Sequence, residues 1–185
     1  MADGSLARRY ARALVEIGQE AGTIDRLGQD LHRFLGVLDT GDGLLGRVLA
    51  NPGLTTGERR GVLDAVLART ELDPMVVNFL RILVEKSRFG ALAEIAQAYQ
   101  AMADERQDRA RATVVTARPL DRQMAERVRQ SLNASTGKDV LLAERVDPSI
   151  LGGMVVHLGD TVYDASIRAR LDRIEDALLR EPGLA

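Results

Sequence analysis

The sequence predicts a mainly α protein, in which an N-terminal six-helix bundle precedes a small C-terminal α+β domain. From residue 5 to about 106, apolar residues recur every three or four positions, the period of helices that bury one face. Beyond residue 109, short β-branched runs bounded by glycine and proline indicate strands and turns. We therefore expect two domains, 1–106 and 107–185. Because aromatic residues make up only 3% of the chain, aliphatic side chains must fill both cores.

Three helices are expected in the first fifty residues. The first ends at Gly22 and carries four apolar residues at the spacing of one inward face: Leu6, Tyr10, Leu14 and Ile17. The second ends at Gly41 and Gly43, and its apolar positions are Ile24, Leu27, Leu31, Phe34, Leu35 and Leu38. A short third helix, with Leu44, Leu45, Val48 and Leu49, stops before Asn51-Pro52.

Capping residues mark the starts of the next two helices. Thr55 with Glu58 three residues later forms a capping box, which opens a fourth helix that points Val62, Leu63, Val66 and Leu67 inward. Asp73-Pro74 supplies an N-cap and a first-turn proline for the fifth helix. Gly90 separates it from a sixth, which buries Leu92, Ile95, Ala96, Tyr99 and Met102.

The C-terminal domain begins after a charged run at 104–109. We expect a strand at 112–116, a helix from the Asp121 cap to Gly137, and a second strand at 140–146. A hairpin joins 154–158 to 161–163 across Gly159-Asp160. A last helix repeats Ile167, Leu171, Ile174 and Leu178, so the expected unit has two helices on a short sheet.

The composition limits the classes of protein that remain. A formal net charge of −2 disfavours bulk attraction to nucleic acid or anionic lipid. The chain has no cysteine, which excludes disulfides and thiolate chemistry. No apolar run approaches the ~18 residues that span a bilayer, and the basic N-terminus lacks the apolar core of a secretory signal. We expect a soluble, intracellular protein.

No pattern of catalytic or metal-binding residues stands out. Gly152-Gly153 precedes a strand, whereas phosphate loops follow a strand and open a helix, so the pair is interpreted as a backbone bend. His32 and His157 fall on different predicted elements without companion ligands. Asp160 and Asp164 fit a turn and the N-cap of the last helix. We expect no catalytic residue, no metal and no cofactor.

Two arginine clusters leave one alternative open. Arg8, Arg9 and Arg12 lie on the first helix, while Arg168, Arg170 and Arg173 lie on the last, where acidic residues are interleaved with them. A nucleic-acid-binding adaptor would use such helices, although stacking aromatics and a basic isoelectric point are lacking. A solvated helix face is the simpler interpretation.

The fifth helix is apolar around more of its circumference than a bundle helix needs. In MVVNFLRILVEKSRF, only Arg81 and Glu85 form a clear polar strip. Either this helix is central, or it buries one face and offers another to a partner. The first helix is widened similarly by Ala7, Ala11 and Ala13. Together the two helices could form a groove for an amphipathic helix.

Three segments resemble one protein family in order and spacing. They are LARRYARAL near the N-terminus, VNFLRILVEKSRFGALAEI in the middle, and the closing ILGGMVVHLGDTVYDASIRARLDRI. The chain resembles the delta subunits of bacterial F-type ATP synthases, homologous to the mitochondrial oligomycin-sensitivity-conferring protein. The resemblance covers nearly the whole chain, and its most specific part is the closing segment.

The resemblance implies a non-catalytic connector, present in one copy per complex. Its N-terminal bundle would bind the N-terminal helices of alpha subunits on the catalytic head. Its C-terminal domain would bind the b subunits of the peripheral stalk, which resists rotor torque during proton-driven ATP synthesis. The protein would lie peripherally on the cytoplasmic side of the bacterial inner membrane, contacting the membrane only through the complex.

The resemblance also implies positions for the two contact surfaces. The family's groove lies between the first and fifth helices, which places five residues in or near it: Tyr10, Ala13, Leu14, Asn78 and Ile82. Three residues are assigned to the stalk-facing surface: Val155, Val162 and Ile167.

Overall fold

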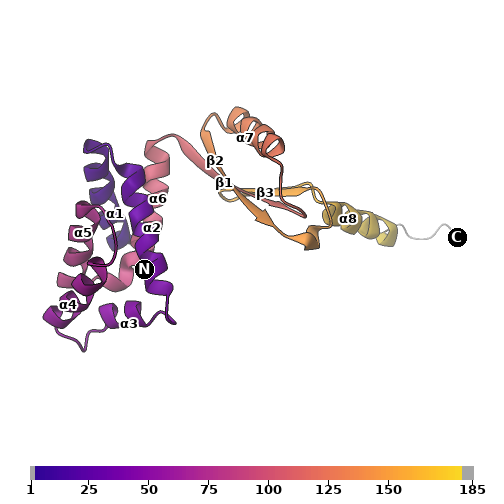
Figure 1. Ribbon diagram of the computed structural model, residues 1–185. Helices are drawn as coiled ribbons and strands as arrows, with labels where there is room; N and C mark the ends of the chain where they lie inside the picture. Colours follow the sequence, from indigo (N-terminus) through magenta and orange to yellow (C-terminus); the bar gives the residue numbers. More distant parts are fainter. Residues whose placement is uncertain (1–2, 181–185) are drawn as a thin grey trace. The chain divides into compact units, whose positions relative to one another are not determined.

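The computed structural model describes residues 3–180 and the side chains of residues 4–174. The chain divides into two compact units, Met1–Ala103 and Asp104–Ala185. The fold class expected from the sequence, a helical bundle followed by a small α+β unit, is confirmed (Figure 1). Of the described helices, none has the length and hydropathy to cross a bilayer.

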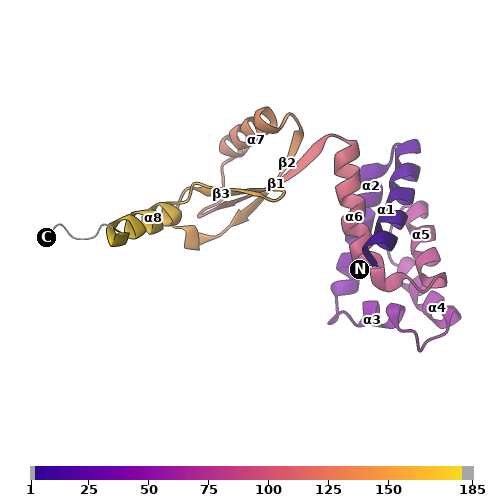
Figure 2. The same ribbon diagram turned by 180° about the vertical axis from the view of Figure 1, so that it is seen from behind.

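The N-terminal unit is a bundle in which α1, α2, α5 and α6 run along the long direction while α3 and α4 lie at one end (Figures 1 and 2). A 3₁₀ turn, Phe89–Ala91, leads directly into α6. The bounds are α1 Asp3–Glu20, α2 Ile24–Asp39, α3 Leu44–Ala50, α4 Thr56–Leu67, α5 Pro74–Glu85 and α6 Leu92–Arg106.

The helix boundaries follow the local capping signals. Thr55 and Glu58 form the predicted capping box: the Glu58 amide donates to Thr55 Oγ1, and the Thr55 amide donates to Glu58 Oε2 at 2.8 Å. Hydrogen bonds from the side chain and the backbone of Thr55 lower the pKa of Glu58. Asp73 Oδ1 accepts from the Met75 amide at 3.0 Å and caps α5 as expected. These starts were predictable because each depends on neighbouring residues only.

Tyr99 on α6 joins three helices in the bundle core. Its side chain is 1% exposed, and its hydroxyl donates to the Ile24 carbonyl at 2.8 Å. A Cβ on Gly18 would lie 3.3 Å from that hydroxyl, and one on Gly28 would lie 3.3 Å from the ring. Small residues on α1 and α2 thus let the ring approach closely. Burial, together with the charge of Asp25, raises the pKa of Tyr99 to about 12.

Replacing Tyr99 by Phe is expected to weaken the bundle by about 1 kcal/mol near pH 8, because the Ile24 carbonyl loses its donor. The raised pKa means that the unfolded chain releases the tyrosine proton near pH 10, before the folded chain does. The free energy of unfolding of wild type should therefore fall between about pH 10 and 12. Urea unfolding followed by circular dichroism should show the wild-type advantage shrinking over that range. An advantage that stays constant to pH 12 would contradict the burial argument.

The inward face of α1 differs from the predicted one. The buried residues are Ala7, Ala11, Leu14, Val15 and Gly18, whereas Ile17 is 48% exposed and Leu6 and Tyr10 are partly exposed. The prediction that Ile17 faces the core was therefore wrong. Ala7, Ala11 and Gly18 share the buried face with Leu14 and Val15, which leaves Ile17 on the exposed side of the helix.

The C-terminal unit contains a four-stranded sheet of order β2-β1-β3-β4. β1 (Arg109–Thr116) pairs in parallel with β2 (Asp139–Val146) across α7 (Arg122–Thr136), and antiparallel with β3 (Met154–Leu158). β4 (Thr161–Asp164) completes the hairpin with β3. The core lies between α7 and the sheet and holds Ala112, Val114, Val140 and Val156, with Val128 and Leu132 packed on it.

The last helix, α8 (Ile167–Arg180), does not lie on the sheet. It contacts the 3₁₀ turn Pro148–Ile150 and extends beyond the strands in both views (Figures 1 and 2). The expectation of two helices packed on the sheet was wrong for α8. The residues of its apolar repeat, Ile167, Leu171 and Ile174, are 46%, 51% and 57% exposed, while Leu178 lies outside the described side chains.

Candidate partner-binding surfaces

The first candidate surface is the seam between α1 and α5. The Tyr10 and Phe79 rings meet edge to face, with centroids 6.2 Å apart and planes at 69°, which brings the two helices together. On either helix an isoleucine remains on the surface, Ile17 at 48% exposed and Ile82 at 45%. We call this surface the α1/α5 groove, formed by Tyr10, Ala13, Ile17, Asn78 and Ile82.

Of the five residues assigned to the groove from the sequence, four are accessible at the surface and one is buried in the core. Ala13, Asn78 and Ile82 are exposed, and Tyr10 is partly exposed beside Phe79. Leu14 is only 2% exposed and belongs to the core beneath them. A partner could therefore contact the first four directly, whereas Leu14 supports the floor. Ile17 was not assigned to the groove, because its position in the apolar repeat indicated a core residue.

The apolar character of α5 has a structural explanation with two parts. Val76, Leu80, Leu83 and Val84 are fully buried, so the helix is central to the bundle. Ile82 is the large apolar side chain of α5 that is substantially exposed. The first alternative, a central helix, is therefore confirmed, while the second, a face offered to a partner, stays a prediction for the side that bears Ile82.

Ion pairs hold α5 against α4 on the side away from α1. Arg81 Nη2 lies 2.9 Å from Asp64 Oδ1, and Arg60 Nη1 lies 3.0 Å from Glu85 Oε1. These two pairs involve the polar strip of α5 that was visible in the sequence. Arg81 and Glu85 are therefore paired with residues of α4, whereas Ile82 has no such pairing and is accessible to other contacts.

A buried polar network fixes the start of α5. Asp30 on α2 is 4% exposed, and its Oδ2 accepts from the backbone amide of Asp73 at 2.8 Å. Arg33 Nη1 lies 3.3 Å from Asp30 Oδ1, and Arg26 Nε lies 3.4 Å from Asp73 Oδ2. Two arginines thus offset the two carboxylates. Because α5 is anchored here, this network also positions its half of the groove.

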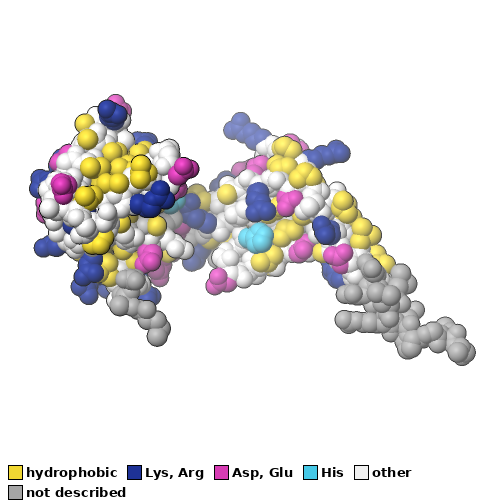
Figure 3. Space-filling model, turned by 90° about the horizontal axis from the view of Figure 1, so that it is seen from below, with side chains coloured by type: hydrophobic (Ala, Val, Ile, Leu, Met, Phe, Trp, Pro, Cys, Tyr) yellow, Lys and Arg dark blue, Asp and Glu magenta, His cyan; other side chains and the backbone are white. Residues whose placement is uncertain are grey.

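The second candidate surface is the apolar edge of α8. Ile167, Leu171 and Ile174 are exposed on α8, and Leu151, which follows the 3₁₀ turn that α8 contacts, is 63% exposed with φ of 63°. Figure 3 shows hydrophobic side chains following α8 toward the grey residues at the C-terminus. We call this set the α8 edge. The spacing of Leu171 and Ile174 predicted an apolar face on a helix that was expected to lie on the sheet. Such spacing shows that a helix has an apolar face, but it does not show which residues cover that face.

The two glycines before β3 hold α8 in place. The Gly152 carbonyl accepts from the Ile167 amide at 2.9 Å, and the Met154 carbonyl accepts from the Ala165 amide at 3.0 Å. Gly153 has φ of +77°, and a Cβ there would lie 2.4 Å from the Ala165 carbonyl oxygen. The interpretation of the pair as a backbone bend is consistent with this geometry. Glycine at position 153 leaves room for the backbone of residues 165–166 to pass close to the bend.

The three stalk-facing residues lie on two separate features. Val114, Val156 and their neighbours face α7, so the adjacent Val155 lies on the opposite side of the sheet. Val162 pairs with His157 and shares that side; it is 53% exposed, while Val155 is partly buried. Ile167 instead belongs to the α8 edge. The structure therefore brings Val155 and Val162 together and associates Ile167 with Leu171.

The residues considered as catalytic or metal-binding candidates either have structural roles or are far from one another in the sequence and in different units. His32 and His157 are exposed and belong to different units, and within the described residues no three potential ligands gather as a metal site would require. The predicted N-cap role of Asp164 was wrong: Ser166 Oγ accepts from the Ala169 amide at 3.1 Å and caps α8. Asp164 instead accepts from the Ser166 amide at 2.8 Å, and this bond chiefly lowers its pKa.

The arginines of α8 are partly engaged within their own unit. Arg168 donates to the Ser149 carbonyl at 3.3 Å, and Arg173 donates to the Ala169 carbonyl at 2.9 Å. Asp172 lies on the same helix between them. The Arg168 bond connects α8 to the preceding 3₁₀ turn, the Arg173 bond stays within the helix, and the mixed charges do not resemble a basic stripe for nucleic acid.

Comparisons with known proteins agree over almost the full chain. Residues 6–178 match the family model described as ATP synthase delta (OSCP) subunit. The chain is 42% identical to the ATP synthase subunit delta of Geobacter sp. (strain M21) over 178 residues, which covers 96% of this chain and 98% of that protein. A Myxococcus xanthus protein of the same name is 38% identical over 180 residues, 96% of this chain and 98% of its own length.

A solved structure gives the same result for the fold. A chain in the cryo-EM structure of the Toxoplasma gondii mitochondrial ATP synthase hexamer superposes with a TM-score of 0.67 at 26% identity. The match covers 96% of the present chain and 99% of that one. Bundle and α+β unit are therefore shared with a chain of an assembled ATP synthase.

Proposed function

The chain belongs to the ATP synthase delta (OSCP) subunit family, and from that premise we propose that it is the non-catalytic connector of the peripheral stalk. Its N-terminal unit binds the N-terminal helices of alpha subunits on the catalytic head, and its C-terminal unit binds the b subunits. By bridging them, one copy per complex resists rotor torque while protons drive ATP synthesis. The subunit lies on the cytoplasmic side of the membrane and makes no chemical step.

One observation carries this proposal: each unit has its own exposed apolar surface. Ile17 and Ile82 flank the Tyr10–Phe79 ring pair in the first unit, and Leu151, Ile167, Leu171 and Ile174 form the α8 edge in the second. Apolar burial gives roughly 25 cal/mol per Å² of surface, whereas an exposed ion pair contributes only ~0–1 kcal/mol. Two apolar surfaces on separate units suit a protein that must hold two partners firmly at once.

The proposal is tested by capture from detergent-solubilised membranes with the tagged full-length chain. Both alpha and b subunits should be retained, and a wash at about 0.5 M salt should not release them, because apolar contacts are screened little by ions. Retention of nucleic acid with steep loss on adding salt would support the arginine-rich adaptor instead. Absence of alpha and b subunits from the retained material would contradict the connector.

A further inference from the structure

The α1/α5 groove has charges of opposite sign at its two ends. Leu6 near the start of α1 and Ser87 just after α5 line the same depression of about 240 Å³, so α1 begins beside the end of α5. Tyr10 then packs on Phe79, about two turns before Ser87 along the chain. The two helices therefore run antiparallel along the groove, and the sequence positions along them can be aligned.

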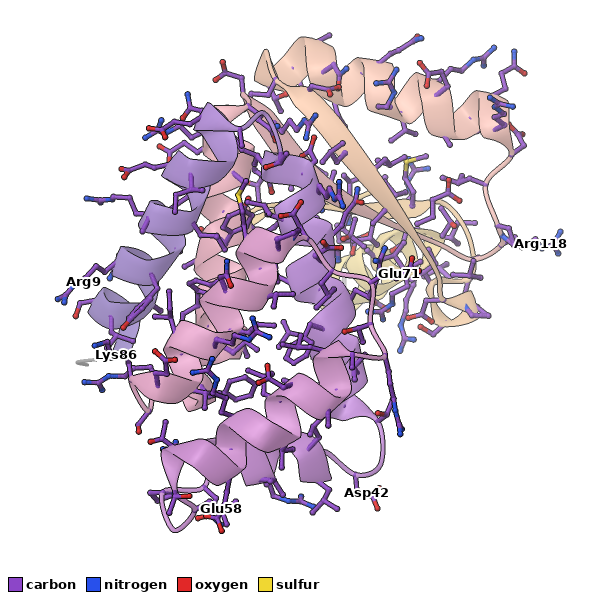
Figure 4. The ribbon with its side chains drawn as sticks, turned by 60° about the vertical axis from the view of Figure 1, so that its left-hand side comes forward. Arg9, Asp42, Glu58, Glu71, Lys86 and Arg118 are labelled. Atoms are coloured by element: carbon purple, nitrogen blue, oxygen red, sulfur yellow. The ribbon has the colours of Figure 1, made fainter. Side chains whose placement is uncertain are left out.

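This alignment gathers cations at one end and acids at the other. The first two turns of α1 and the residues just after α5 carry four exposed basic residues: Arg8, Arg9, Lys86 and Arg88. The far end of α1 has Glu16 and Glu20, both exposed. Among the side chains that the structure describes, two acids lie near the basic end, but Glu85 pairs with Arg60, and Glu94 lies beyond Arg88 in the small depression. Asp3, at the start of α1, lies outside the described side chains. In Figure 4, Arg9 and Lys86 extend from the bundle on the same side.

The basic side chains that border the groove are not neutralised within the bundle. Among the described residues, the side chains of Arg9, Arg12 and Lys86 have no hydrogen bond or ion pair, in contrast to Arg60 and Arg81 on the other side of α5. A depression of about 670 Å³ is lined by residues of α1 alone, with the arginines toward the start of the helix and Glu16 toward its end: Ser5, Arg8, Arg9, Arg12, Ala13 and Glu16. The arginines therefore lie next to Ala13, one of the residues that form the α1/α5 groove.

We propose that the groove takes an amphipathic helix with carboxylates on the turn that passes Arg9 and Lys86, and that these charges set the direction in which the helix lies. This inference rests on the proposed function and specifies the chemistry of its first partner. The apolar face of the helix provides most of the affinity, and the charges select one of two directions along the seam. The reverse direction would place the carboxylates against Glu16 and Glu20.

Affinity measurements test the charges. A synthetic peptide of the alpha-subunit N-terminal segment from the same organism is titrated into the full-length chain by calorimetry at low and high salt. The double variant Arg9→Glu/Lys86→Glu should bind about tenfold more weakly at low salt, and the difference should vanish near 0.5 M salt. The matched control Arg47→Glu/Arg118→Glu changes the net charge equally at exposed sites on α3 and after β1, and should bind as wild type does.

The direction in which the peptide lies is measured with spin labels. Because the chain has no cysteine, a single introduced cysteine can be labelled specifically. A label on Gly4→Cys marks the basic end of α1, and one on Ala21→Cys marks the acidic end. The carboxylate-bearing turn of the isotope-labelled peptide should be broadened by the first label and not by the second.

The possible outcomes separate this inference from the proposed function. Binding that is lost in Ile82→Asp but unchanged in the charge variant overturns the inference and leaves the connector role standing. A carboxylate-bearing turn that lies beside the Ala21 label, or a peptide with no carboxylate on that turn, also overturns it. A peptide that does not bind wild type at all contradicts both.

Discussion

Replacing Gly153 by Ala is expected to lower the free energy of unfolding of the C-terminal unit by about 3 kcal/mol. Two costs combine at this position. The residue has φ of +77°, a region that non-glycine residues enter at roughly 1–2 kcal/mol. The new Cβ would also lie 2.4 Å from the Ala165 carbonyl oxygen and 3.1 Å from the Ser166 Cα, both backbone atoms. The segment leading into α8 would have to move away.

Gly159→Ala is the matched control for this prediction. Gly159 lies in the turn of the hairpin that follows Gly153, with φ of +56°, and a Cβ there would meet nothing within 4 Å. It should therefore show the backbone cost alone, about 1 kcal/mol. Calorimetric unfolding of both variants, with amide exchange at Ile167 and Ala165 as a local probe, would separate the two costs. If the two substitutions lower the free energy of unfolding equally, the contact between residue 153 and the backbone of residues 165–166 does not contribute to stability.

The other large effect concerns the groove. Ile82→Asp is expected to weaken binding of the catalytic head by at least about a hundredfold, because removing the water from a carboxylate placed against an apolar helix face costs several kcal/mol. The free protein should keep its stability, since Ile82 is 45% exposed and its neighbours Leu83 and Val84 form the core contacts. Binding is measured by titrating the alpha-subunit N-terminal peptide, and folding by thermal unfolding of the same sample.

Ala65→Asp provides the control for Ile82→Asp. Ala65 is exposed on α4, and the substitution adds the same charge outside the groove. It should leave peptide affinity within about twofold of wild type, because isolated surface substitutions perturb little. An Ile82→Asp protein that binds normally, or one that fails to fold, would remove Ile82 from the proposed contact.

Features that depend on adjacent residues could be predicted from the sequence. The Thr55–Glu58 capping box, the Asp73 cap and the turn at Gly159 were all visible as local patterns, and the change of periodicity after residue 109 located the second fold type. The closing segment identified the family because its order of glycines, strands and helix start is unusually specific. Each of these signals needs no knowledge of tertiary packing.

Features that depend on distant contacts could not be predicted. Apolar spacing placed Ile17 on an inward stripe and Leu171 on the apolar stripe of the last helix, yet neither helix has a neighbour over that stripe in its own unit. The role of Gly153 requires residues 165–166 to return across it, and the anchoring of α5 requires Asp30 from a helix forty residues earlier. Periodicity shows that a helix has an apolar face, but only packing decides whether the chain itself or a partner covers it.

The central claim, two independent docking surfaces on one connector, is tested most directly by a crossed binding measurement. Purified catalytic head and purified b subunits are each applied to the immobilised full-length chain as wild type, Ile82→Asp and Leu171→Asp. Wild type should bind both; Ile82→Asp should lose the head and keep the b subunits, and Leu171→Asp should do the reverse. If both folded variants lose the same partner, or if neither loses any, the assignment of one surface to each partner is wrong.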